Sequence, residues 1–244
     1  MKMKRDFKNI LIIRPDAIGD LCLMTPAFKA LRQKFPEATL TLFTRSYAQD
    51  LFENTSLLDE LIIDEGIYNL IFHRQKISRA EYAKYIKIFK EKNFDLIIHA
   101  NDLMPYNLMG FFAKIPYRLG DKARISTNLL QNLRSLQRWK DITRHECEQN
   151  LLMLEALGIR GEPEDMEIKP AAASLTKIKQ VLASNNIKEN DLVIGLHVGT
   201  GTGNKSWNPT GYPELVNKIL EKYPQAKVVL SGGQDQIENT KEVK

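Results

Sequence analysis

The chain has 244 residues and a net charge of +5, with 43% hydrophobic and 27% charged residues, which is typical of a globular protein with a substantial core. No apolar run of about 18 residues occurs, and the basic start leads into a short strand, so neither a membrane span nor a secretion signal is predicted. The two cysteines, Cys22 and Cys147, lie far apart without metal-ligand spacing, which favours reduced thiols and a cytoplasmic protein.

The opening segment, residues 9–35, is predicted to form a strand, a tight turn and a helix. Residues 10–14 are mostly apolar and have the length of a buried strand, and the apolar side chains after the turn recur at helical spacing. Ligands of open α/β sheets bind at the carboxyl ends of strands, where such turns lie. Asp20, next to Gly19 in this turn, is therefore a candidate functional carboxylate, although an aspartate that only caps a helix fits the same pattern.

Strands and helices are expected to alternate through the rest of the first 160 residues. We expect strands at 38–44, 58–64, 94–99 and 116–119, and helices at 47–53, 78–92 and 145–157, with an apolar helix ending near residue 113. Residues 65–76 lack periodicity and are expected to form a loop. Ser78 and Glu81 have the spacing of a capping box. The alternation predicts βαβ units around a parallel sheet.

A second, smaller α/β domain is expected after a linker. Residues 161–173 contain two prolines and several acids and are the best linker candidate, which gives domains at 1–160 and 174–244. The second domain is expected to contain helices at 175–184 and 213–223 and strands at 191–197 and 226–231. Two strands are few for a stable sheet, so this domain is expected to be incomplete.

The positive charge is concentrated between residues 114 and 144, which hold eight Lys or Arg residues and two Asp residues. This excess predicts an anionic partner, such as a phosphate, a sugar carboxylate, a lipid headgroup or a nucleic acid, although a solvated basic face fits as well. No nucleic-acid-binding module is recognisable, and aromatic residues are not interleaved with the basic ones. A nucleic-acid partner is therefore not expected.

A glycine-rich loop, VGTGTGNKSW at 198–207, follows the strand predicted at 191–197. Its backbone N–H groups, threonine hydroxyls and Lys205 suit a phosphate, although a flexible surface turn has the same composition. The spacing matches neither a P-loop nor a dinucleotide fingerprint. The four histidines lack metal-ligand spacing, and no nucleophile motif occurs.

Two long motifs resemble glycosyltransferase family nine, the ADP-heptose:lipopolysaccharide heptosyltransferases. ILIIRPDAIGDLCLMTPAFKALRQKFP is similar to the family's N-terminal motif, with Gly19-Asp20 and Thr25-Pro26-Ala27-Phe28 at its landmarks. LHVGTGTGNKSWNPTGYPELVNKI resembles its second-domain motif, with Trp207-Asn208-Pro209 replacing a simple Trp-Pro pair. The resemblance implies the GT-B fold, in which two Rossmann-like domains with parallel sheets flank the active site.

The resemblance also implies a function. It predicts an inverting, metal-independent transfer, without a cofactor, of a sugar such as heptose from a nucleotide sugar such as ADP-heptose. The acceptor would be an anionic glycolipid, a lipopolysaccharide core or related glycan, reached by peripheral contact with the inner membrane surface. Asp20 matches the family's proposed general base. The donor candidates are Thr200, Gly201, Thr202, Lys205 and Asp235. The acceptor candidates are Gly19, Arg74, Lys76, Arg118, Lys122 and Arg124.

The family pattern continues with an Asp-[ST]-Gly-Pro-x-His-like loop that helps to bind the donor, and this motif does not occur in the 244 residues. Weak donor binding and little turnover are therefore expected of these residues alone. The alternative function is a nucleotide-sugar-binding protein without catalysis.

Overall fold

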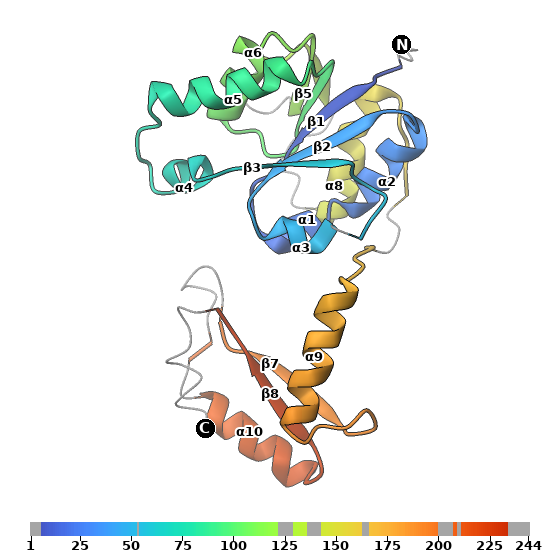
Figure 1. Cartoon of the computed structure of the whole chain (residues 1–244), viewed down its shortest axis with the longest axis vertical. Helices are drawn as coiled ribbons and strands as arrows, with labels where there is room; N and C mark the ends of the chain where they lie inside the picture. Colours follow the sequence, from blue (N-terminus) through green and yellow to red (C-terminus); the bar gives the residue numbers. More distant parts are fainter. Residues whose placement is uncertain are drawn as a thin grey trace. The chain divides into compact units, whose positions relative to one another are not determined.

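The computed structural model describes residues 6–52, 54–121, 129–135, 143–162, 166–199, 207–208 and 211–233. The chain divides into two compact units, residues 1–171 and 172–244. Each unit has its own sheet, and each is described here by itself (Figure 1).

A six-stranded parallel sheet forms the centre of the first unit (Figure 1). The strands lie in the order β3-β2-β1-β4-β5-β6, and each neighbouring pair is parallel. Their bounds are β1 Asn9–Ile13, β2 Thr39–Thr44, β3 Glu60–Ile63, β4 Leu96–His99, β5 Tyr117–Asp121 and β6 Leu133–Ser135. From β1 the strands are added toward one edge of the sheet as far as β3, and from β4 they are added toward the other edge. The switch point between β1 and β4 is the place where open α/β sheets bind ligands.

Helices cover both faces of this sheet because its central strands are apolar on both sides. On one face, alternate residues such as Ile10 and Ile12 pack with α1 (Ile18–Cys22), α2 (Thr25–Lys34), α3 (Ala48–Phe52) and α8 (Glu146–Met153). On the other face, Leu11 and Ile13 pack with α4 (Ile67–Phe72), α5 (Arg79–Glu91) and α6 (Met104–Phe112). The sequence alternation predicted this doubly covered α/β sheet, and the prediction is confirmed.

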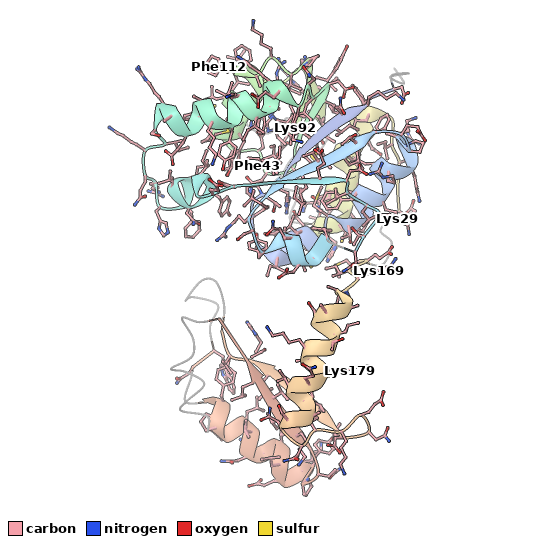
Figure 2. The ribbon with its side chains drawn as sticks, viewed as in Figure 1. Lys29, Phe43, Lys92, Phe112, Lys169 and Lys179 are labelled. Carbon is pink, nitrogen blue, oxygen red and sulfur yellow. The ribbon has the colours of Figure 1, made fainter. Side chains whose placement is uncertain are left out.

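Phe43, labelled in Figure 2, belongs to the hydrophobic core between the sheet and helices α4, α5 and α6. Its ring is fully buried and makes edge-to-face contacts with three other rings, at centroid distances of 5.1 Å to Tyr85, 5.8 Å to Phe89 and 5.4 Å to Tyr106. Such pairs stabilise a core beyond the area that they bury. Because Phe43 belongs to β2, this packing fixes the strand whose end leads into Arg45.

The structure corrects the expected loop at 65–76, because α4 lies within it. Asp64 caps this short helix: its carboxylate accepts hydrogen bonds from the backbone N–H groups of Gly66, Ile67 and Tyr68 at 2.7–3.0 Å. The hydroxyl of Tyr106 donates a fourth bond to the same carboxylate, at 2.8 Å. An aspartate at the end of a strand thus supplies the start signal that the helix's own residues lack.

Three smaller differences concern other elements. The helix expected after the first turn is divided into α1 and α2, because Pro26 at the start of α2 has no N–H to continue a helix. The helix expected at 145–157 becomes a 3₁₀ turn, η1 (Leu154–Leu157), after Met153. The short strand β6 was not predicted, because its three residues have no pattern of their own and pair only with β5.

The second unit contains α9 (Ala172–Ser184), β7 (Val193–His197), α10 (Gly211–Lys222) and β8 (Lys227–Ser231). β7 and β8 pair in parallel, from Val193 with Lys227 to His197 with Ser231. The side chains of both strands are half-buried or exposed within the described residues. The order of elements is the one expected from the sequence.

The longest helices in the described ranges, α5 and α9, have 13 residues each. A helix needs about 20 mostly apolar residues to cross a bilayer. None of the described helices is long and apolar enough to do so.

Candidate active site

A buried arginine organises the carboxyl end of β1. The backbone N–H of Arg14 donates to the carbonyl of Phe43 at 3.0 Å, so Arg14 extends the pairing of β1 with β2 by one residue. Its side chain is only 1% exposed. A fully buried guanidinium needs hydrogen-bond partners and compensating charge.

Arg14 finds those partners on three segments that are distant in sequence. Its Nη1 donates to the carbonyl of Ala100, after β4, at 2.8 Å, and its Nη2 donates to Glu146 Oε1, on α8, at 2.9 Å. Its Nε lies 3.0 Å from Asp16 Oδ1, and its Nη2 lies 3.7 Å from Asp20 Oδ1. One guanidinium thus faces three carboxylates and ties α8 and β4 to the turn after β1.

Asp16 is the buried member of this group, with 7% of its surface exposed. Burial raises the pKa of its carboxyl from 3.8 to about 6, because the charged form loses its hydration. The nearby charge of Asp20 raises this pKa further, whereas Arg14 and a hydrogen bond from Asn101 oppose the rise. Asp16 therefore changes its protonation close to neutral pH.

Asp20 is the accessible member, with its side chain 37% exposed. It is the third residue of α1, and its Oδ2 accepts a hydrogen bond from the backbone N–H of Ala17 at 3.1 Å. The two sequence interpretations are thus not exclusive, since the carboxylate helps to begin a helix and also presents an oxygen to solvent. Gly19 beside it is exposed, and a Cβ there would meet no atom within 4 Å among the described residues. Packing therefore does not require a glycine at this position.

A second arginine lies at the same edge of the sheet. Arg45 directly follows β2, and its guanidinium lies over the rings of Tyr47 and Tyr68, 5.3 Å and 5.7 Å from their centroids. Burial raises the pKa of both tyrosines, that of Tyr47 to about 12, and the charges of Asp16 and Asp20 also raise them. The two rings are therefore within electrostatic reach of the carboxylates after β1.

A small pocket, with a cavity volume of about 30 Å³, lies at the carboxyl ends of the neighbouring strands. It is lined by His99, Ala100, Asp121, Ser135, Glu146, Gln149, Asn150 and Met153. Asn150 donates to the carbonyl of Leu23 at 3.2 Å, which fixes α8 against the end of α1. Glu146 both lines this pocket and binds Arg14, so the pocket adjoins the carboxylate cluster.

The acceptor candidates that the structure describes differ in what their side chains contact. Arg118 donates from its Nε to the carbonyl of Leu130 and from its Nη1 to that of Ile115, both at 2.6 Å, so it joins loops of the fold. Arg74 and Lys76 follow α4 and are exposed, and within the described ranges neither has a hydrogen bond or ion pair to Asp20. Their role in binding an acceptor stays a prediction.

Seven predicted site residues lie outside the described residues: Lys122, Arg124, Thr200, Gly201, Thr202, Lys205 and Asp235. The strands that lead into the expected donor loops are described. β7 ends at His197 and β8 at Ser231, and these two residues pair in the ladder and interact through His197 Nδ1 and Ser231 Oγ at 3.1 Å. Both loops therefore leave the same edge of this small sheet.

Sequence reasoning identified Asp20 but missed Arg14, Glu146, Arg45 and Tyr68. Arg14 was counted only as the end of an apolar strand, and its contact with Glu146 spans 132 residues. A charged residue that ends an otherwise apolar strand is the only local signal for Arg14. The other three become site residues only when the fold brings the strand ends to one edge.

Comparisons with known proteins concern the family and the fold of the chain. The sequence model of glycosyltransferase family 9 (heptosyltransferase) matches residues 82–244. A putative glycosyltransferase of Haemophilus influenzae is 24% identical over 242 residues, covering 97% of this chain and 67% of the relative. The chain therefore spans about two thirds of the length of that relative.

Solved structures show the same fold. A family 9 glycosyl transferase from Veillonella parvula superposes with a TM-score of 0.81 at 19% identity, over 99% of this chain and 67% of that protein. The ADP-heptose lps heptosyltransferase II of Escherichia coli gives a TM-score of 0.69 at 18% identity, over 96% and 67%. The expected GT-B-type α/β fold, with an incomplete second domain, is confirmed. With a family match over more than half of its residues, this chain belongs to glycosyltransferase family 9, the heptosyltransferase family.

Proposed function

We propose that this chain transfers a heptose from ADP-heptose to a lipopolysaccharide-type acceptor, with inversion at the anomeric carbon and Asp20 as the general base. The observation that carries the proposal is the partly exposed Asp20 carboxylate, which lies after β1 beside a fully buried arginine. The position is the switch point of the sheet, where ligands of such folds bind. The named substrates of the E. coli structure with the same fold supply the sugar, the nucleotide and the acceptor class.

The chemistry requires one proton acceptor and one stabilised leaving group. An acceptor hydroxyl attacks the anomeric carbon, and the bond from that carbon to the diphosphate oxygen breaks, its electron pair leaving with the diphosphate. The hydroxyl proton passes to Asp20. Nη2 of Arg14 lies 3.7 Å from Asp20 Oδ1, so a fixed positive charge faces the carboxylate that would take this proton.

The proposal assigns the leaving group to the second unit. Thr200, Gly201, Thr202 and Lys205 would bind the diphosphate through backbone N–H groups, hydroxyls and one cation, and Asp235 would bind the nucleotide. A fixed cation next to developing negative charge is a large source of rate enhancement. In this proposal the ammonium group of Lys205, and not a metal ion, stabilises the negative charge on the leaving diphosphate.

The test compares wild type with Asp20→Asn, and with Asp50→Asn, an exposed aspartate of α3, as the matched control. Transfer from ADP-heptose to heptose-deficient lipopolysaccharide is followed by mass spectrometry, and ADP-heptose binding by calorimetry. Loss of a general base lowers kcat by about 10²- to 10⁴-fold, while the affinity for ADP-heptose stays unchanged. Equal transfer by wild type and Asp20→Asn would exclude Asp20 as the base.

A second function is nucleotide-sugar binding without transfer. It rests on the loop at 198–207, whose glycines, threonines and lysine suit a diphosphate. The same experiment separates the two functions, because a binding protein would take up ADP-heptose and transfer nothing, whether or not Asp20 is replaced. Offering ADP-, GDP- and UDP-sugars in parallel tests the choice of nucleotide.

A further inference from the structure

Arg45 is a cation without an anionic partner among the residues that the structure describes. It is half-buried; its backbone carbonyl accepts from the N–H of Ala48 at 3.1 Å, but among the described residues its side chain makes no hydrogen bond and no ion pair. Arg14, by contrast, has hydrogen bonds to two other segments and an ion pair to Asp16 in its own turn. The Arg45 guanidinium lies over the rings of Tyr47 and Tyr68. Stacking on rings holds a guanidinium in place and leaves its N–H groups available.

Tyr47 adds a second unsatisfied group at the same place. Its hydroxyl is buried and has no hydrogen-bond partner within the described residues. A buried hydroxyl without a partner is unfavourable, and an oxygen atom of a ligand would remove that cost. Tyr68 belongs to the first turn of α4, and its backbone N–H donates to Asp64. One tyrosine thus comes from the turn before α3 and the other from α4.

The negative charge near Arg45 indicates what kind of ligand group Arg45 would bind. Three carboxylates surround Arg14: Asp16 and Asp20 after β1, and Glu146 on α8. An anionic acceptor would be repelled there unless its negative group lay on a separate cation. Arg45 follows the neighbouring strand β2, so it can bind the negative group while an uncharged hydroxyl approaches Asp20.

We propose that Arg45, Tyr47 and Tyr68 form a subsite that binds an oxyanion of the acceptor sugar, next to the hydroxyl that receives the transferred sugar. The inference rests on the proposed function and adds to it the group that orients the acceptor. The two parallel N–H groups of the Arg45 guanidinium would bind a carboxylate or a phosphate through charge-assisted hydrogen bonds. The tyrosine hydroxyls would donate to the same oxyanion or to a ring hydroxyl. This site differs from the basic residues that the sequence suggested, of which Arg118 is already hydrogen-bonded within the fold.

The test measures binding without a donor, so it does not depend on turnover. The full chain is titrated by NMR with glucuronate, with glucose 6-phosphate and with uncharged glucose. We compare wild type with Arg45→Gln, Arg45→Lys and Tyr47→Phe. Arg79→Gln, at an exposed arginine at the start of α5, is the matched control.

Arg45→Gln should lower the affinity for the two charged sugars by about tenfold or more, because hydrogen bonds to charged groups are the strong ones. Its affinity for glucose should stay the same as that of wild type. Arg45→Lys keeps the charge but lacks the two parallel N–H groups, so its loss should be smaller, and Arg79→Gln should bind as wild type does. An effect on glucuronate alone identifies a carboxylate, and an effect on glucose 6-phosphate alone identifies a phosphate.

Two results would overturn the subsite. One is wild-type affinity of the folded Arg45→Gln or Arg45→Lys protein for both charged sugars, and the other is a wild type that binds neither better than glucose. The Asp20 experiment can fail separately: a chain that binds the oxyanion through Arg45 but transfers equally well with Asp20→Asn keeps the subsite and loses the proposed base.

Discussion

Replacing Asp16 with Asn should change how the stability of the first unit depends on pH. The wild-type carboxyl has a pKa of 3.8 when exposed to water and about 6 when folded. Between these values the unfolded chain ionises while the folded protein stays protonated, so folding loses stability as pH rises through this window. Asparagine cannot ionise, and the variant therefore lacks this loss.

The magnitude follows from the two pKa values. Each pH unit of difference corresponds to about 1.36 kcal/mol, so full ionisation of buried Asp16 costs roughly 3 kcal/mol. Part of this cost is already present at pH 4. The free energy of unfolding of Asp16→Asn, relative to wild type, should therefore rise by about 2 to 3 kcal/mol from pH 4 to pH 7. Any lost contact with Arg14 shifts the whole curve but does not change its slope.

Hydrogen exchange of the β1 core amides, corrected for intrinsic rates, measures this free energy for the first unit alone. Asp50→Asn, at an exposed position, serves as the control and should follow wild type at every pH. A difference between Asp16→Asn and wild type that stays constant with pH would refute the assignment of a raised pKa to Asp16. A difference that falls as pH rises would reverse the sign of the argument and refute it as well.

Three further substitutions test the scaffold of the site. Arg14→Met leaves carboxylates without their buried cation and should cost about 3–5 kcal/mol of stability, measured by the same exchange experiment. Ser78→Ala removes the hydroxyl that caps α5 and should cost about 1 kcal/mol, seen as a lower thermal midpoint. Gly120→Ala places a Cβ against Nε2 of buried Gln131, which is hydrogen-bonded to Asp102 and Asn107. Breaking these bonds should cost about 1–3 kcal/mol, measured by denaturant unfolding.

The parallel sheet could be predicted because its signals are local. The apolar runs that became β1, β2 and β4 have strand length and are bounded by polar residues. Helix α5 was predicted from Ser78 and Glu81, whose reciprocal capping bonds the structure contains. Helix α4 and strand β6 were missed because their stabilising contacts come from elsewhere, from Asp64 before α4 and from β5 beside β6.

The candidate site could be predicted only in part, for the same physical reason. Asp20 lies in a turn whose position at a strand end is readable from the sequence. Arg14 acquires its partners from Ala100 and Glu146, which are 86 and 132 residues away. Nothing in the composition of α8 indicates that its first residue would bind a buried arginine. Likewise, the basic residues were judged by their density along the chain, whereas Arg45 is an isolated charge that stands out because its side chain has no ion pair within the described ranges.

The two aspartates after β1 are both possible bases, and their surroundings separate them. A pKa of about 6 would suit Asp16 to accept a proton near neutral pH. Its carboxylate, however, is buried and its Oδ1 lies 3.0 Å from Arg14 Nε, so an acceptor hydroxyl has little access to it. Asp20 has the exposure, and its Oδ2 is fixed by the backbone N–H of Ala17. Accessibility to the acceptor hydroxyl is a stronger criterion for the general base than the pKa, because a proton moves only between atoms in hydrogen-bond contact. Asp16 is then better understood as a buried group that competes with Asp20 for Arg14, so that its protonation adjusts the charge that Asp20 experiences.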